Sequence, residues 1–378
     1  MRRVGRLVVQ RSNRISRGRF LRVAGASLAV GSGLSALACQ PNTSPNQGGG
    51  GGSENSDEKV LNYFNWSDYL DPNTIPDFEK EFGVKVNESY FASPDEQLAK
   101  IQAAGGSEYD VTFPGDSTAE TMIKSQLLRK LDMSKIPNFD NIGARYKGLP
   151  FDPDNEYTVP FTWGTTGILY NKREIGEISG WEAMWDPRFE GKIAMLDDMR
   201  EVVGAALKLL GYSLNTKNLD QLEEAKQKLI EQKPLVRAYL ADIQMRDALW
   251  DKDVLLGQCY SGTASTAIFE DKDLEYVIPE EGATRWTDNM AIPANAPHPE
   301  IAHQFINYIL RPKVGASTTN YTRFASPNEA ALPFIDEGIK NDPSTYPPPE
   351  TFERLETIQD VGATTRDYQR VYTEVKSA

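Results

Sequence analysis

The sequence predicts an α/β protein of two lobes, each a mostly parallel sheet flanked by helices, with a ligand cleft between the lobes. Three observations support this prediction. Strand-like and helix-like segments alternate from Val60 to Pro114, which is typical of βαβ units and a parallel sheet. A similar alternation resumes after residue 190. Between the two units, residues 160–171 read as one long strand that is suited to cross from lobe to lobe.

The first unit contains three expected strands and two helices. The strands are KVLNYF (59–64), VKVNESY (84–90) and YDVTFP (109–114). The first helix, IPDFEKEF, ends at Gly83. The second begins at Ser93, a serine cap followed by proline at the first helical position and by glutamate three residues after the cap. Ligands bind beyond the carboxyl ends of parallel strands, so YFNWSDYL and YDVTFPGDS lie at the expected binding edge.

The second unit continues to the C-terminus. Further strands are expected within residues 191–198, 253–262, 274–282 and 285–294. Helices are expected from about Arg200, over 219–230, over 298–311 and near 365–376. Apolar residues recur at helical spacing in the last two helices, and Pro312 is expected to end the first of these.

These elements assign the chain to four parts. Residues 1–38 form an export signal peptide, and residues 39–57 form a flexible tether. The N-terminal lobe comprises residues 58–163 plus 288–333, and the C-terminal lobe comprises residues 164–287 plus 334–378.

The N-terminus indicates export. Residues 1–38 contain eight arginines and no acidic residue, and they end in a run of small apolar residues. This pattern is typical of a signal peptide and not of a membrane span. Ordinary cleavage after Ala38 fits, and so does a lipobox that leaves Cys39 as the lipidated first residue. Because a glycine-rich tether follows Cys39, the segment resembles a bacterial lipoprotein. We expect a periplasmic protein; anchoring to the cytoplasmic membrane and the export route, Sec or twin-arginine, stay open.

The charge of the chain argues against a nucleic-acid partner. The net charge is −13, and removing the eight arginines of the signal leaves −21 for the remainder. Such an acidic chain offers little that could neutralise phosphates. It favours a cationic ligand, although acidity alone also serves solubility.

Cysteine and histidine are too scarce for a metal site, a disulfide framework or a Ser-His-Asp triad. Apart from Cys39 there is only Cys259, in an apolar strand-like run where a small core residue is the expected role. The histidines are His298 and His303. We therefore expect no metal and no cofactor.

Aromatic rings and carboxylates gather at the strand ends and turns that face the expected cleft. They are Trp66, Ser67, Asp68 and Tyr69; residues 110–117; Trp163; Asp197, Asp198 and Glu201; Tyr260; Trp286 and Asp288; and Phe324. An aromatic face attracts an ammonium group by about 0.5–2 kcal/mol. A carboxylate adds a charge-assisted hydrogen bond, and a buried dication needs carboxylate partners. The combination favours a linear diamine or polyamine.

Most of these residues also have a structural explanation. Asp198 and Glu201 fit a helix N-cap with an acid in the first turn. Asp288 could pair with Arg285, and Trp163 could serve packing at a hinge. Asp68 is expected to begin a turn.

Seven segments carry a family resemblance: NWSDY, PFTWGTTGILYN, LDDMREVV, LLGQCYSGTA, RWTDNMAIPANA, FINYILRP and YPPPETFERL. In this order, from about Val60 to the C-terminus, they resemble the spermidine/putrescine-binding proteins of bacterial polyamine ABC transporters. The resemblance implies a type II periplasmic-binding-protein fold that closes around one polyamine. It also implies an ABC permease and its ATPase as partners. We expect a monomer.

The resemblance further implies roles for single residues. Trp66 and Tyr69 match ring positions, and Ser67 matches a small polar contact. Asp198 and Glu201 match acids that bind one amine. Trp286 matches a ring, and Asp288 matches an acid that meets another nitrogen.

Other positions depart from the family pattern. Tyr260 stands where the family usually has tryptophan, and Phe324 where it often has tyrosine. Ser117 follows the third strand, where the family differs, and Gln359 lies near a family glutamine. Thr263 replaces an acid that putrescine-selective relatives have. These departures leave the choice between putrescine and spermidine open.

Three other function classes remain. A binding protein of this fold for another ligand, such as a glycan, is the nearest alternative. A hydrolase could use two carboxylates, Asp198 or Glu201 together with Asp288. A structural envelope lipoprotein would bind no ligand. We expect a binding protein and not an enzyme.

Overall fold

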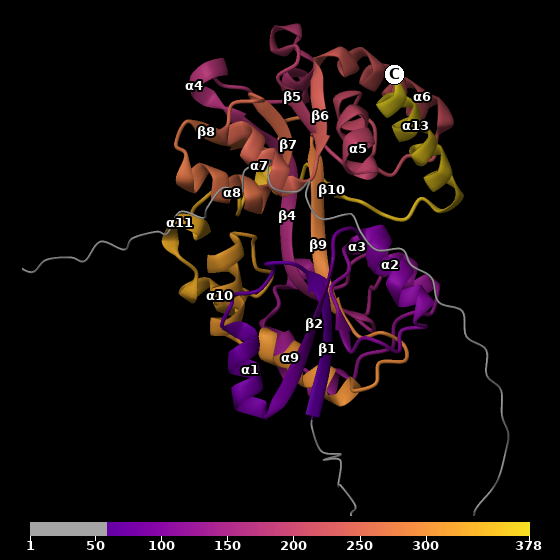
Figure 1. Cartoon of the computed structure of the whole chain (residues 1–378), viewed down its shortest axis with the longest axis vertical. Coiled ribbons are helices and arrows are strands. Elements are labelled where there is room, and N and C mark those ends of the chain that lie inside the picture. Colours follow the sequence, from indigo (N-terminus) through magenta and orange to yellow (C-terminus); the bar gives the residue numbers. More distant parts are fainter. Residues whose placement is uncertain (1–58) are drawn as a thin grey trace, which may run out of the picture. The chain divides into compact units, whose positions relative to one another are not determined.

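The computed structural model describes residues 59–378, which form one mixed sheet flanked by helices (Figure 1). The strands follow the order β2-β1-β3-β9-β4-β7-β5-β6, while β8 pairs with β4 and β10 with β9. Their bounds are β1 Lys59–Trp66, β2 Val84–Phe91, β3 Val111–Thr112, β4 Thr158–Asn171, β5 Ile193–Leu196, β6 Val236–Leu240, β7 Leu256–Tyr260, β8 Leu274–Val277, β9 Ala283–Ala291 and β10 Leu355–Thr357.

Helices flank this sheet. They are α1 Thr74–Phe82, α2 Pro94–Ala103, α3 Asp116–Lys124, α4 Lys172–Ile175, α5 Met199–Leu209, α6 Leu219–Gln232, α7 Asp242–Trp250, α8 Ser261–Glu270, α9 Pro299–Ile309, α10 Pro312–Thr322, α11 Glu337–Lys340, α12 Pro349–Phe352 and α13 Thr365–Ser377. No helix among these is long and apolar enough to cross a membrane.

The predicted helix-end signals in the first βαβ unit are confirmed. Gly83 ends α1 in the left-handed conformation, with φ 61°, and its amide bonds to the Glu79 carbonyl. The Ser93 side chain accepts from the Glu96 amide and so caps α2. The strands on either side, β1 and β2, pair in parallel over their whole length.

Several elements differ from the sequence prediction. Strand β3 has only two residues, and β7 ends at Tyr260 because α8 starts at Ser261. Pro312 follows the end of α9, as expected, but it also starts α10, since proline is well suited to the first helical position. Helices α3 and α7 and strand β6 were not expected.

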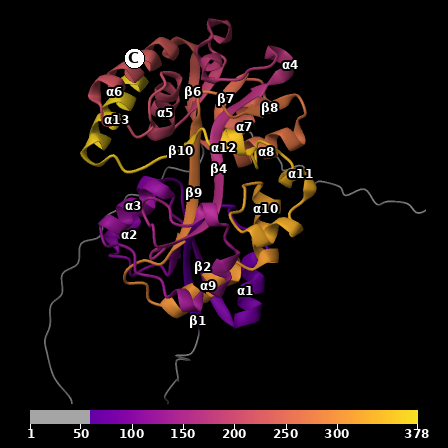
Figure 2. The ribbon, with the colours of Figure 1, turned by 180° about the vertical axis from the view of Figure 1, so that it is seen from behind.

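Two sets of parallel strands are joined by a central antiparallel pair. Strand β1 is parallel to β2 and β3, and β5 is parallel to β6 and β7. Between these sets β4 runs antiparallel to β9, and the two lie side by side in both views (Figure 2). β4 has fourteen residues, all buried, which confirms the predicted long strand.

The core is divided along the same line. One cluster contains Leu61, Phe113 and Phe305 and lies around the first parallel set. A second contains Val202 and Val371 and lies around the other set. This arrangement leaves the β4–β9 pair between two separate cores, where side chains from both can meet.

Candidate functional site

A continuous row of aromatic side chains crosses the β4–β9 pair. The ring centroids of Tyr260 and Trp286 lie 5.8 Å apart, those of Trp286 and Phe324 5.3 Å, and those of Phe324 and Tyr69 5.6 Å. Each contact is edge to face, with interplanar angles of 80°, 78° and 65°. This geometry is favoured by ring quadrupoles, and aromatic rings of this kind can attract a cation. The four residues are called the ring row below.

The four rings come from four distant parts of the chain. Tyr69 follows β1, Tyr260 ends β7 and Trp286 lies on β9. Phe324 follows α10, whose end is set by Arg323 in the left-handed conformation at φ 61°. The structure therefore brings together the ring positions that the sequence placed at strand ends and turns in both units.

Two glycines make room for the ring row. A Cβ atom on Gly164, which pairs with Trp286 across β4 and β9, would lie 2.4 Å from Trp286 Cζ2. A Cβ atom on Gly262 would lie 2.2 Å from Phe324 Cδ1. Both distances are shorter than carbon atoms tolerate, so only glycine lets the two rings lie against the backbone.

Asp198 and Glu201 lie together at the start of α5. Asp198 is the N-cap and accepts from the amides of Arg200 and Glu201 at 2.9 and 3.1 Å, which confirms the expected capping role. The Glu201 carboxylate is 4% exposed and accepts hydroxyl hydrogen bonds from Thr166 and Thr284 at 2.9 and 2.8 Å. Burial raises the pKa of both acids, and the Asp198 charge raises that of Glu201 further.

Asp288 lies near the Tyr69 end of the ring row. The Tyr69 hydroxyl donates to Asp288 at 2.5 Å and lies 3.1 Å from the Thr162 hydroxyl. Thr162 faces Asp288 in the register of β4 and β9. Burial raises the pKa of Asp288 to about 6, although the Tyr69 hydrogen bond lowers it. Asp288 has no ion pair with Arg285 or any other cation in residues 59–378. The alternative prediction, that Asp288 pairs with Arg285, is therefore wrong.

The acids surround one hydroxyl. Burial raises the pKa of Tyr260 well above its usual value, and the charges of Asp198, Glu201, Asp242 and Asp288 raise it further. Within the described chain none of these carboxylates forms an ion pair. A buried carboxylate without a countercharge costs several kcal/mol, roughly, when it ionises. The site is therefore suited to a ligand that brings positive charge.

The two nearest arginines are committed elsewhere. Arg200 donates to the carbonyls of Leu214 and Gln359 and to the side chain of Asn215. Arg285 donates to the Thr357 hydroxyl, and its guanidinium lies 4.8 Å from the centroid of the Phe352 ring. Neither guanidinium is within ion-pair distance of an acid beside the ring row.

Four candidates make no described contact with the ring row. Trp66 packs on Phe91 with centroids 4.5 Å apart. Ser67 is exposed, and Ser117 is the second residue of α3; within residues 59–378 neither side chain has a hydrogen bond. Gln359 is exposed and bonds only through its backbone, to Arg200 and Asn215.

The remaining candidates serve structure. Trp163 is 2% exposed and packs against Tyr146, so the packing role is confirmed. Asp197 pairs with Lys376 at 2.6 Å. Cys259 is buried and free, as expected for a core residue. Within residues 59–378, no group of three or more metal-ligating residues occurs. Cys39, the signal and the tether lie outside the described residues.

Sequence reasoning missed Asp242. This acid is the first residue of α7 and follows β6, a strand that the sequence pattern did not reveal. The residues of β6 are mostly half-buried and do not alternate between apolar and polar. Had that strand been recognised, the rule that ligands bind at strand ends would have pointed to Asp242.

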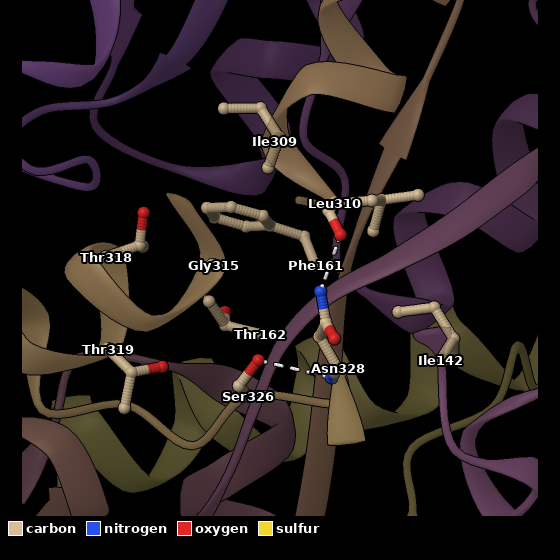
Figure 3. Close-up of a pocket in the computed structure, with 10 residues that line it drawn as sticks. All are labelled: Ile142, Phe161, Thr162, Ile309, Leu310, Gly315, Thr318, Thr319, Ser326 and Asn328. Atoms are coloured by element: carbon tan, nitrogen blue, oxygen red, sulfur yellow. Dashed lines mark hydrogen bonds between the residues drawn. The ribbon is translucent and has the colours of Figure 1, made fainter. Parts of the chain in front are cut away.

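Two cavities are lined by other residues than the ring row. The first, of about 10 Å³, is about the size of a single water site and is bordered by Thr162, Ser326 and Asn328 among others (Figure 3). The second, of about 220 Å³, is lined in part by Arg145, Tyr146 and Phe352. Neither is lined by a ring of the row or by the acids around Tyr260.

Comparison with known proteins adds independent information. Residues 73–347 match the family model of the bacterial extracellular solute-binding proteins. A spermidine/putrescine-binding periplasmic protein of Salmonella typhimurium is 35% identical over 85% of this chain and 93% of its own length. The putrescine-binding periplasmic protein SpuD of Pseudomonas aeruginosa is 35% identical over 86% of this chain and 94% of its own.

Solved structures of similar proteins agree with this family match. A protein described as a spermidine/putrescine ABC transporter from Listeria monocytogenes superposes with a TM-score of 0.80 and 37% identity, covering 84% of this chain and 99% of that one. The substrate-binding protein PotD of Streptococcus pneumoniae gives 0.77 and 34%, covering 85% and 99%. These matches confirm the family resemblance and the two-lobe α/β fold.

Proposed function

Because the chain belongs to the family of bacterial extracellular solute-binding proteins, we propose that it captures a polyamine, putrescine or spermidine, for an ABC transporter. The observation that carries this proposal is the ring row with uncompensated carboxylates beside it. The rings offer faces to the methylene groups and the charge of the ligand, and the acids receive its ammonium groups.

The acids fall into two groups that suit the two ends of a linear amine. Asp198 and Glu201 form one group, on the α5 side. Asp288 forms the other, held by Tyr69. Each ammonium would gain a charge-assisted hydrogen bond, and an interaction of this kind contributes about 1.5–3 kcal/mol. A neutral sugar would leave the carboxylates without a countercharge, which argues against a glycan.

Capture works by lobe closure in this proposal. The N-terminal lobe, residues 58–163 plus 288–333, contributes Tyr69, Asp288 and Phe324. The C-terminal lobe, residues 164–287 plus 334–378, contributes the Asp198–Glu201 pair and Tyr260. A polyamine bound to both sets favours the closed form, because only that form brings them together. The separate cores on either side of β4 and β9 support these boundaries.

The partners and the location follow from the relatives. The relatives from Salmonella typhimurium and Pseudomonas aeruginosa are periplasmic binding proteins, and we infer the same compartment here, with anchoring through a lipidated Cys39 as the finer proposal. The closed protein delivers its ligand as a monomer to a permease driven by an ATPase. It has no catalytic step and needs no cofactor: Glu201 and Asp288 bind amines and do not cleave a bond.

Titration calorimetry tests the function. The purified protein, stripped of bound amines, is titrated with putrescine, spermidine and spermine, with glucose and glutamate as controls. At least one polyamine should bind with a Kd of about 1 µM or below, which corresponds to about −8 kcal/mol. Absence of heat with all three polyamines would contradict the proposal.

A further inference from the structure

Asp242 is a half-buried acid whose hydrogen bonds are incomplete. Its carboxylate accepts from the Thr263 hydroxyl, and its other contacts are long: 3.5 Å from the Tyr260 amide nitrogen and 3.7 Å from Cys259 Sγ. Burial raises its pKa to about 6. A hydrogen bond weakens steeply beyond normal length, so only the Thr263 contact is strong.

Asp152 shows how this protein satisfies an acid with a structural role. That side chain is 3% exposed and accepts four hydrogen bonds of 2.8–3.0 Å, from the amides of Glu156, Tyr157 and Thr158 and from the Thr158 hydroxyl. Asp242 has one close donor where Asp152 has four. The difference leaves Asp242 with capacity for a further donor.

No cation of the described chain supplies that donor. Arg246, whose charge lowers the pKa of Asp242, pairs instead with Asp247 at 2.9 Å. Within residues 59–378 Asp242 takes part in no ion pair. A carboxylate in this position is stabilised by a positive charge that arrives from outside the chain.

Asp242 lies beside Tyr260, one end of the ring row. Its carboxylate contacts the backbone of Tyr260, and its charge raises the pKa of both Tyr260 and Tyr69, the two ends of the row. An ammonium group lying on these rings would therefore also be near Asp242. This position is distinct from the Asp198–Glu201 pair and from Asp288.

We propose that Asp242 is a further ligand-binding residue, whose carboxylate receives an ammonium group beside Thr263 and Tyr260. The proposal rests on the proposed polyamine function and deepens it. With Asp242 the site has three anionic positions, so it binds a triamine more tightly than a diamine. Thr263 is uncharged, but its hydroxyl orients the Asp242 carboxylate, which supplies the negative charge.

A purely structural role for Asp242 predicts a different effect of its replacement. Asp242 also lies at the start of α8, where Tyr260 is the N-cap and Thr263 is in the first turn. If it acted only as a cap, replacing it with asparagine would lower stability a little and affect all ligands alike. The two roles are therefore separated by the ratio of the affinities for two amines.

The experiment compares spermidine, a triamine, with putrescine, a diamine, by calorimetry on the purified wild type, Asp242→Asn and Asp251→Asn. The control removes a charge from an exposed residue at the end of the same helix that makes no ion pair within residues 59–378. Asp242→Asn should weaken spermidine binding by about tenfold or more and putrescine binding by at most about threefold. Asp251→Asn should change both by less than about threefold.

Equal losses for the two amines in Asp242→Asn, or unchanged spermidine affinity, would overturn the assignment. A wild type that binds neither amine would instead overturn the polyamine function itself, so the two failures are distinguishable. Near-UV circular dichroism checks the fold. Should Asp242→Asn fail to fold, Asp242→Ser retains a capping hydroxyl without the charge, and the same selective loss is expected.

Discussion

The Tyr69 hydroxyl donates a hydrogen bond to Asp288, a residue 219 positions further along the chain. This contact joins the turn after β1 to the middle of β9, next to Trp286. It holds a half-buried carboxylate at the Tyr69 end of the ring row while leaving that carboxylate without a countercharge. Tyr69 thereby positions an acid whose remaining hydrogen-bonding capacity is available to a ligand.

Removing the Asp288 charge should weaken polyamine binding. In Asp288→Asn the side chain keeps its shape and can still bond to Tyr69, but it no longer attracts an ammonium group. We expect the affinity for spermidine and putrescine to fall by about tenfold or more, with the fold intact. Calorimetry measures the loss. Tyr69→Phe keeps the charge and removes only the orienting hydroxyl, so its loss should be smaller; unchanged affinity in Asp288→Asn would exclude Asp288 from the site.

The ring row depends on the two glycines beneath it. Gly262→Ala should displace Phe324, and Gly164→Ala should displace Trp286, because each new methyl group would overlap a ring. Binding should weaken to a degree similar to Trp286→Ala, about tenfold. Gly338→Ala is the matched control, since a Cβ atom there meets nothing within 4 Å. Normal binding by Gly262→Ala would show that the position of Phe324 does not matter to the ligand.

Polyamine affinity should rise with pH. Burial raises the pKa of both Asp288 and Asp242 to about 6, so these acids are largely protonated at about pH 5 and ionised at about pH 7.5. An ammonium group binds the ionised form, so calorimetry should show weaker binding at the lower pH. In Asp288→Asn the dependence should be reduced. A pH-independent affinity in the wild type would contradict the role of these acids.

The stability of the ligand-free protein should change in the opposite direction. An acid whose pKa is raised by folding holds its proton more tightly in the folded state. Between the usual value of 3.8 and about 6, the folded state therefore binds more protons at Asp288 and Asp242 than the unfolded state does. The free energy of unfolding then falls as the pH rises through this window. Thermal denaturation of Asp288→Asn and the wild type, with and without spermidine, measures the effect; a contribution of Asp288 that increases with pH without ligand would refute it.

Asp152 should matter for folding and not for binding. Replacing it with alanine leaves the amides of Glu156, Tyr157 and Thr158 without their acceptor. We expect a loss of about 3 kcal/mol or more in the free energy of unfolding. Urea denaturation measures it, and the preference between spermidine and putrescine should stay unchanged. A changed preference would mean that the comparison with Asp242 is not valid.

Much of the architecture could be predicted because the signals were local. The cap at Ser93, the stop at Gly83 and the buried run of β4 are each set by adjacent residues. Helix α7 and strand β6 were missed since their apolar residues do not recur regularly, and their place in the fold depends on contacts with β5 and β7. Tertiary packing decides such segments.

Several members of the ring row and its acids could be named from the sequence. Rings and acids at strand ends identified Tyr69, Trp286 and Asp288, since residue type and position in a strand sufficed. The sequence could not show that Gly262 supports Phe324 or that Asp242 has a single strong donor, because both depend on distances between remote segments. Gln359, placed by resemblance alone, makes no side-chain contact with the ring row.

The central claim is that a polyamine lies along the ring row with its ammonium groups on the surrounding acids. The most direct measurement is a crystal structure of the protein with spermidine. The account predicts a linear ligand along the rings from Tyr260 to Tyr69, with nitrogens about 2.7–2.9 Å from carboxylate oxygens of Asp288 and of the Asp198–Glu201 pair. Spermidine bound elsewhere, for example in the 220 Å³ cavity beside Tyr146 and Phe352, would contradict it.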